Sequence, residues 1–252
     1  MNIVKGEDVK IGKNVKINVD YLELGDRTVI NDNCIIEGKK IVLGKECWLD
    51  EYTHIGGGSC FDGEFTAGDW LHMGKFSHVN QARDVCMGDE VGVGINTKIF
   101  THGAYLSAYD GFPTSFSPVN IGSRVWLPNA WVNPDVCIGD DVVVSAMSLV
   151  NKNLPSGCLA GGVPAKILKE NCYPKPLSGI EKRGLIAKVL LDVNIPAKIE
   201  AGKIHAGLTV FNIDDRVISG PSTKRTEALK NQLRRYGVRF KYKTMRGEYV
   251  KW

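Results

Sequence analysis

The chain of 252 residues has no long apolar run, no closely spaced pair of cysteines and no N-terminal segment of the signal-peptide type. No stretch approaches the roughly 18 apolar residues that a membrane-spanning helix needs, so no membrane span is expected. The seven cysteines are odd in number and form no C-x-x-C pair, which argues against a disulfide framework and against a zinc knuckle. The first residues lack an apolar core of signal-peptide length. These absences predict a cytoplasmic protein.

The net charge is small but unevenly distributed along the chain. The formal total is +4, yet residues 216–252 hold eleven Lys and Arg against two acidic residues. The pattern predicts a basic C-terminal module attached to an acidic body. A basic surface can bind nucleic acid or a membrane. Because no recognised nucleic-acid motif is present, we expect this surface instead to bind the diphosphate of a nucleotide-linked sugar or to pack against the acidic body.

What the sequence does have is a hydrophobic repeat with a period of six. Fifteen of the twenty gaps between the apolar residues that open successive units are six residues long. Strands have a period of two and helices of 3.6, so a sustained period of six is typical of a parallel β-helix. Three units would make one triangular coil of 18 residues, and residues 11–153 would form about seven coils. The series runs Ile11, Ile17, Leu24, Ile30, Ile36, Leu43, Leu49, Ile55, Phe61, Ala67, Met73, Val79, Met87, Val93, Ile99, then Ile121, Leu127, Val132, Ile138, Val144 and Val150.

The repeat stops once, between Ile99 and Ile121. His102 closes the last unit before the break, and a loop rich in aromatic residues, Gly, Ser and Pro follows it over residues 103–118. Loops of this length on a regular scaffold are usually functional. A break beside a titratable side chain therefore predicts the position of a site.

The units around this break resemble the hexapeptide-repeat acyltransferases, and most of all their sugar O- and N-acetyltransferases. The resemblance is carried by residues 87–102, 118–126, 133–142 and 162–166, within a similar region of about 73–170. It implies a mainly β fold, a left-handed parallel β-helix, assembled as a homotrimer with active sites between neighbouring subunits. It also implies transfer of an acetyl group from acetyl-CoA to a hydroxyl or amino group of a sugar or nucleotide-sugar. On this resemblance His102 is the general base, a role that suits imidazole because it titrates near neutral pH.

The resemblance extends to the residues that contact each substrate. Asn80 and Tyr105 are expected at the acceptor, although Asn80 could equally be a corner residue of the β-helix. Leu127–Trp131 is one residue shorter than the Gly-rich run of many family members, so the path of CoA there stays open. The residues expected along the acyl donor are Trp126, Asn129, Ala130, Ser145, Ala146, Lys152, Gly162, Pro164 and Lys166.

The repeats predict a β-helix domain over residues 1–170, with the loop 103–118 as an insertion. After a Pro-rich linker, residues 176–252 predict a small basic α/β module. We expect helices over 178–193 and from Ser222 or Thr223 to Tyr236 in this module, and strands over 208–212 and 238–242.

Two other functions remain open at this stage. His54 and His72 are 18 residues apart, one full coil, so they could stack on one face and, with His78 nearby, bind zinc or iron. That arrangement would suit a γ-class carbonic-anhydrase-like hydratase. The chain could also be a non-catalytic trimeric scaffold that binds a partner through its basic tail. The acetyltransferase is preferred, and it requires no metal.

Overall fold

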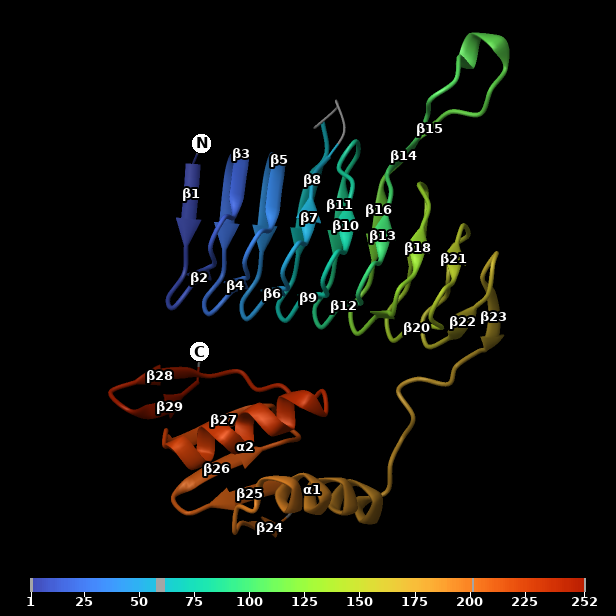
Figure 1. Ribbon diagram of the computed structural model, residues 1–252. Helices are drawn as coiled ribbons and strands as arrows, with labels where there is room; N and C mark the ends of the chain where they lie inside the picture. The colour runs from blue at the N-terminus through green and yellow to red at the C-terminus, as the bar shows by residue number, and fades with distance from the viewer. Residues whose placement is uncertain (1, 58–61, 201, 252) are drawn as a thin grey trace. The chain divides into compact units, whose positions relative to one another are not determined.

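The computed structural model describes residues 2–57, 62–200 and 202–251 and divides the chain into two compact units, Met1–Lys175 and Pro176–Trp252 (Figure 1). The first unit contains the six-residue repeats, and the second contains the basic C-terminal segment. Within the described ranges, no helix is both long and apolar enough to cross a membrane.

The N-terminal unit is a parallel β-helix in which short strands of successive coils stack into flat faces (Figure 1). One face is a nine-stranded sheet, in the order β2 (Lys10–Ile11), β4 (Val29–Ile30), β6 (Trp48–Leu49), β9 (His72–Met73), β12 (Gly92–Val93), β17 (Trp126–Leu127), β20 (Val143–Val144), β22 (Leu159–Gly161) and β23 (Lys166–Lys169). All its neighbours are parallel except β23, which turns back antiparallel to β22.

The other two faces form one twelve-stranded sheet, because β3 (Lys16–Leu24) and β5 (Ile35–Leu43) are long enough to continue around a corner. Beside the later halves of these two strands lie β1 (Asn2–Lys5), β8 (Glu64–Ala67), β11 (Val85–Met87), β16 (Val119–Ile121) and β19 (Cys137–Ile138). Beside the earlier half of β5 lie β7 (His54–Ile55), β10 (His78–Val79), β13 (Lys98–Ile99), β18 (Trp131–Val132) and β21 (Leu149–Val150). We call this last group the β10–β13 face.

Within the described residues, the apolar residues that open the units point into the β-helix, as the period of six predicts. On the β10–β13 face these residues stack in one column in which no member is more than 1% exposed: Ile36, Ile55, Val79, Ile99, Val132 and Val150. The predicted fold class is thereby confirmed for this unit, since each coil buries its aliphatic side chains against the next coil.

Aspartate side chains hold successive corners together. The Asp140 carboxylate accepts a hydrogen bond from the backbone N–H of Ser123 in the preceding coil, at 2.6 Å. A Cβ atom on Gly122 would lie 2.4 Å from the same oxygen, so only glycine fits there. The same backbone-to-carboxylate bond recurs at Asp26, Asp32, Asp69, Asp84 and Asp89. This contact explains why Gly and Asp follow the inward residue so often.

The period of six hides a second interruption, between Ile55 and Ala67. In neighbouring coils Ile36 is followed by its next inward residue after seven residues, at Leu43, whereas Ile55 is followed by Ala67 after twelve. The sequence interpretation counted Phe61 as a unit between them; Phe61 itself lies outside the described residues, and β8 follows β7 directly in the coil. Because the inserted segment is about one unit long, the hydrophobic pattern does not reveal it.

The predicted loop leaves the β-helix as a two-stranded antiparallel ribbon, β14 (His102–Gly103) and β15 (Ser115–Phe116), with the 3-10 helix η1 (Ala108–Asp110) near its tip (Figure 1). His102 lies at the root of this ribbon, opposite Phe116. Tyr105 and Tyr109 lie further out and are almost fully exposed.

The C-terminal unit is a six-stranded sheet with two helices, as the predicted α/β module requires. Its strands are β24 (Lys198–Glu200), β25 (Lys203–Ala206), β26 (Thr209–Asn212), β27 (Val217–Pro221), β28 (Lys243–Met245) and β29 (Glu248–Val250). The predicted helices are confirmed as α1 (Gly179–Val193), capped by Ser178, and α2 (Lys224–Arg235), capped by Thr223.

The predicted strand at residues 238–242 is wrong, because β28 begins only at Lys243. The alternation that suggested it is real, since Phe240 and Tyr242 are buried while Lys241 is exposed. This segment makes only an isolated bridge from Lys241 to Val217, and β27 pairs with β29 instead. Lys230 of the basic segment is half-buried, and its Nζ atom bonds Glu227 and Tyr242 at 2.7 Å each.

Phe65 is the largest fully buried side chain of the β-helix interior, and its replacement tests that core. We expect Phe65→Ala to lower the free energy of unfolding of this unit by about 3–5 kcal/mol, because the surrounding coils cannot close the cavity. Chemical denaturation followed by circular dichroism measures the change. Phe76→Ala is the matched control, since Phe76 is 47% exposed and stacks on Tyr52 at the surface. An equal loss in both variants would contradict the assignment of this core.

Candidate functional site

His102 lies at the corner where the chain leaves β13 and enters the ribbon. Its ring stacks on Phe116 with the centroids 5.9 Å apart and the planes inclined by 19°. The Arg83 guanidinium lies 5.3 Å from the Phe116 ring centroid. The imidazole is half-buried, so it is held by neighbours and still accessible to a substrate.

Asn80 fixes the protonation of the His102 ring. The Asn80 side chain is 2% exposed, and its Oδ1 atom lies 2.7 Å from His102 Nδ1. Its Nδ2 atom donates to the carbonyl of Gly57 at 2.7 Å and its Oδ1 atom accepts the backbone N–H of Ala82 at 3.3 Å, and these two bonds set the orientation of the amide. An amide oxygen accepts hydrogen bonds, so Nδ1 must carry the proton and Nε2 must hold the free lone pair. The ring is therefore presented as a base through Nε2.

Thr101, the neighbour of His102 in the chain, bonds to Asn80 and so links it to His102. Its hydroxyl lies 3.0 Å from Asn80 Oδ1 and 3.1 Å from the Asn80 carbonyl, and it accepts the backbone N–H of Arg83 at 3.0 Å. These bonds lie between neighbouring coils and are buried. The position of Asn80 relative to His102 is thus fixed by the β-helix and does not depend on the exposed loop.

Most of the residues predicted along the acyl donor gather at the other end of the β10–β13 face. There the chain turns from the nine-stranded sheet into β18 and β21, and the turns of successive coils stack. The carbonyl of Asn129 accepts the N–H of Met147 at 3.0 Å, and the N–H of Gly162 donates to Ser148 Oγ at 3.0 Å. We call this the donor corner; of the predicted residues it includes Asn129, Ala130, Ser145, Ala146 and Gly162.

Ala130 has its backbone groups engaged inside the β-helix, whereas Trp126 lies on the outer surface. The N–H of Ala130 donates to Thr97 Oγ1 at 3.2 Å, and its carbonyl accepts the N–H of Lys98 at 2.9 Å. Trp126 lies on β17 with its ring over Gly92, where a Cβ atom would come within 2.4 Å of the indole. The ring is 44% exposed and so keeps a free face.

The remaining predicted residues lie away from these groups. Lys152 is exposed at the corner that follows β21. This corner is at the same end of the β10–β13 face as His102. Pro164 is exposed just before β23, and Lys166 is the first residue of that strand. Tyr105 is 98% exposed on the ribbon. Within one subunit, the structure brings Asn80 to His102 but does not bring Tyr105 or Lys152 to the donor corner.

The outer surface between the two corners carries residues that the sequence interpretation did not assign. Phe100 and Trp131 contact each other with ring centroids 5.6 Å apart, and Lys98 Nζ donates to the carbonyl of Phe76 at 2.7 Å. Burial lowers the pKa of Lys98. Strand residues alternate between faces, so Phe100 and His102 point outward as Lys98 does. This spacing of two residues in the sequence could have identified Phe100 and Lys98 as neighbours of His102 on the outer surface.

The histidine stacking that supported the hydratase alternative is wrong. His72 lies on the nine-stranded sheet between Trp48 and Gly92, with its Nε2 atom 3.1 Å from Asp50 Oδ2. His54 is in register with His78 instead, because the insertion after Ile55 lengthens this coil to 24 residues, against 19 in the coil before it. In the described part of the chain, no group of three or more His, Cys, Asp and Glu side chains could hold a metal ion.

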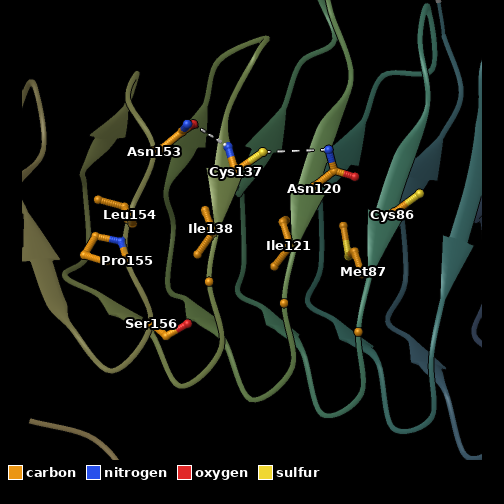
Figure 2. Close-up of a pocket in the computed structure, with 13 residues that line it drawn as sticks. Cys86, Met87, Asn120, Ile121, Cys137, Ile138, Asn153, Leu154, Pro155 and Ser156 are labelled. Atoms are coloured by element: carbon orange, nitrogen blue, oxygen red, sulfur yellow. Dashed lines mark hydrogen bonds between the residues drawn. The ribbon is translucent and has the colours of Figure 1, made fainter. Parts of the chain in front are cut away.

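A shallow groove lies on another face, across β11, β16 and β19 (Figure 2). Cys86, Asn120, Cys137 and Asn153 line it, and the Asn120 amide lies 3.8 Å from the Cys137 sulfur. The Asn153 side chain accepts the N–H of Cys137 at 2.7 Å. His102 is on the β10–β13 face, so this groove is separate from the candidate site.

Known proteins similar to this chain include several acetyltransferases. Galactoside O-acetyltransferase of Escherichia coli strain K12 is 31% identical over 116 residues, which cover 42% of this chain and 57% of the relative. A second protein of that strain, provisionally named a lipopolysaccharide biosynthesis O-acetyl transferase, is 34% identical over 116 residues, covering 44% and 59%. The chain thus spans less than two thirds of the length of these relatives.

The resemblance to hexapeptide-repeat acyltransferases of the sugar acetyltransferase type is confirmed. No family model matches the chain. Among solved structures, a hexapeptide-repeat acetyltransferase of Vibrio cholerae complexed with acetyl-CoA is 25% identical, with a TM-score of 0.35, over 53% of this chain and 68% of that one.

Proposed function

We propose that this protein transfers an acetyl group from acetyl-CoA to a hydroxyl or amino group of a sugar or nucleotide-sugar. The observation that carries the proposal is the 2.7 Å contact between His102 Nδ1 and the buried Oδ1 atom of Asn80. A histidine held in this tautomer, at the only long break of the described repeats, is suited to general-base catalysis. The names of the similar proteins support the reaction class and the sugar acceptor.

The proposed reaction is a direct transfer. His102 Nε2 removes the proton of the acceptor hydroxyl or amine as that group attacks the thioester carbonyl, and a tetrahedral intermediate forms. The carbon–sulfur bond then breaks, and the departing thiolate receives the proton from the imidazolium. The products are the acetylated acceptor and free CoA, and the ring returns to its starting tautomer. Asn80 holds Nδ1–H throughout and stabilises the imidazolium.

We propose that acetyl-CoA lies along the donor corner, with its thioester directed across the β10–β13 face toward His102. The small and bent residues there, Ala146 and Gly162 among them, leave room for the pantetheine arm. Lys166 and Pro164 would lie nearer the phosphates, whereas Lys152 follows β21 at the end of the face nearer His102. A second copy of the chain in a homotrimer would cover the β10–β13 face, and its exposed ribbon would bring Tyr105 toward the acceptor.

Binding of CoA tests the placement of the donor. We expect Ala146→Trp to weaken CoA binding at least about tenfold in titration calorimetry, because the indole would fill the donor corner. Ala104→Trp on the exposed ribbon is the matched control and should bind CoA as the wild type does. Equal affinities in both variants would contradict CoA binding at this corner, and a wild type that does not bind CoA would favour the scaffold alternative.

The acceptor is identified by measuring the release of the CoA thiol from acetyl-CoA. The panel consists of methyl β-galactoside, methyl α-glucoside, glucosamine and UDP-N-acetylglucosamine. We expect thiol release with at least one of these sugars, at a rate that a chelator does not change. Bicarbonate dehydration without acetyl transfer would overturn the proposal.

A further inference from the structure

The tautomer of His102 depends on which way the Asn80 amide points. In the observed orientation Oδ1 faces the imidazole and Nδ2 faces the Gly57 carbonyl. If the amide turned over, an N–H group would face Nδ1. Nδ1 would then have to accept, the ring proton would move to Nε2, and Nε2 could no longer remove a proton from an acceptor. The amide is held by the carbonyl of Gly57 at Nδ2, at 2.7 Å, and by the N–H of Ala82 at Oδ1, at 3.3 Å; the shorter bond, to Gly57, is thus one of two contacts that keep the base in its active form.

His78 holds Gly56, the residue before Gly57, in place. Its Nε2 atom lies 2.9 Å from the carbonyl oxygen of Gly56, so Nε2 carries the proton and donates to it. The backbone N–H of Gly56 donates to the Val79 carbonyl at 2.9 Å, which ties the Gly56–Gly57 turn to the same strand. The Gly56–Gly57 turn is thus bound to β10 by two hydrogen bonds, one of which comes from the His78 side chain.

Packing fixes the turn from the other side. The rings of His54 and His78 stack with centroids 4.7 Å apart. Gly57 lies against their edges with a positive φ of 87°, and a Cβ atom there would lie 3.0 Å from His78 Nε2 and 3.2 Å from His54 Cε1. Only glycine fits at this distance without displacement of the turn. The two rings therefore form the surface on which Gly57 rests.

His78 is suited to this role in its neutral form. Burial lowers its pKa, and the neighbouring His54, Lys98 and His102 lower it further, while the bond to Gly56 opposes the shift. A neutral ring donates one hydrogen bond without adding positive charge beside His102. Glu37, whose Oε2 atom lies 3.5 Å from His54 Nε2, is the acidic group on the far side of the stack.

We propose that His78 is a positioning residue for His102, acting through the Gly56–Gly57 turn and the amide of Asn80. The inference rests on the proposed role of His102 as the base. His78 bonds Gly56 and stacks on His54, so it reaches His102 only through Gly57 and Asn80. Their contribution is to the fraction of molecules in which His102 Nε2 is free to accept a proton, so their loss should lower kcat and leave acetyl-CoA binding unchanged.

The test compares His78→Phe, which keeps a ring against His54 but loses the N–H donor, with His78→Gln, whose amide can restore that donor. In protein with 15N-labelled histidine, NMR should show the His102 ring of the wild type protonated at Nδ1, with His102→Gln identifying its signals. We expect His78→Phe to shift these signals toward the Nε2-protonated form and to lower kcat about tenfold with a KM for acetyl-CoA within twofold. His78→Gln should restore both readouts largely to wild-type values.

His72→Phe is the matched control, since it removes a histidine from the adjacent face, and both readouts should stay unchanged. Gly57→Ala is the second route: its Cβ displaces the turn, and the same shift in tautomer is expected, even if His78→Phe fails to fold. An unchanged Nδ1-protonated ring in both His78→Phe and Gly57→Ala would overturn the inference. Because NMR needs no acceptor, this outcome is distinguishable from failure of the proposed function, which full activity of a His102 variant would show.

Discussion

Replacing His102 with alanine is expected to lower kcat by about 10²–10⁴, the usual loss when a general base is removed. The expectation follows because the His102 ring has one nitrogen available to the acceptor. Nδ1 is bound to Asn80, so that nitrogen is Nε2. The KM for acetyl-CoA should change little, because the donor corner lies at the opposite end of the β10–β13 face. Steady-state kinetics with the acceptor identified in the panel measures both constants.

Two results would speak against this assignment. Turnover near the wild-type level in His102→Ala would show that another group removes the proton. An equal loss in His72→Ala, on the adjacent face, would show that the effect is general and not catalytic. Circular dichroism should confirm that both variants keep the β-helix, since the imidazole of His102 is not part of the buried column.

Asn80→Leu is expected to lower kcat by about 10²-fold while the affinity for CoA is kept. Leucine has nearly the same shape as asparagine but offers no acceptor, so it no longer selects the Nδ1–H tautomer; a wrong tautomer is severely limiting in other histidine-dependent enzymes. The variant also leaves the Gly57 carbonyl unpaired, which should cost about 1–3 kcal/mol of stability. Kinetics and thermal unfolding separate the two effects.

Asn80→Asp is the informative companion. Its carboxylate can still accept from Nδ1, so the tautomer is kept, but its negative charge favours the imidazolium. The base is active only when neutral, so the acid limb of the kcat/KM profile should move to higher pH. An acid limb at the wild-type position, with full activity in Asn80→Leu, would remove Asn80 from the mechanism and leave it as a corner residue.

The sequence was sufficient to predict the β-helix because the inward residue of each unit repeats whatever the corners do. It also located the break after His102, since nothing else interrupts the apolar series for so long. The helices of the C-terminal unit followed from capping residues such as Ser178 and Thr223, whose contacts are local. These features all depend on neighbours within a few residues along the chain.

The relation between coils was harder to predict, because it depends on the length of every corner. The insertion after Ile55 contains about one repeat, so it left the apolar count intact while moving each later residue to a different face from the one counted. This is why His54 was paired with His72 rather than His78, and why the part played by Gly57 at Asn80 was not foreseen. The bond between Asn80 and His102 spans 22 residues and requires the register of two complete coils.

The insertion after Ile55 shows that the buried core and the functional surface follow two different repeat lengths. The hydrophobic interior depends on the position of a residue within the six-residue unit, whereas the functional surface depends on its position within the whole coil of about eighteen residues. An insertion of one whole unit therefore leaves the buried pattern unchanged but moves the surface residues of later units to a different face. Segments added in multiples of six can therefore be acquired without disturbing the core, and they can bring new backbone beside an existing side chain. In chains of this type, equivalent surface positions should be found from the hydrogen-bonded partners of each strand, since a fixed offset in sequence will miss them.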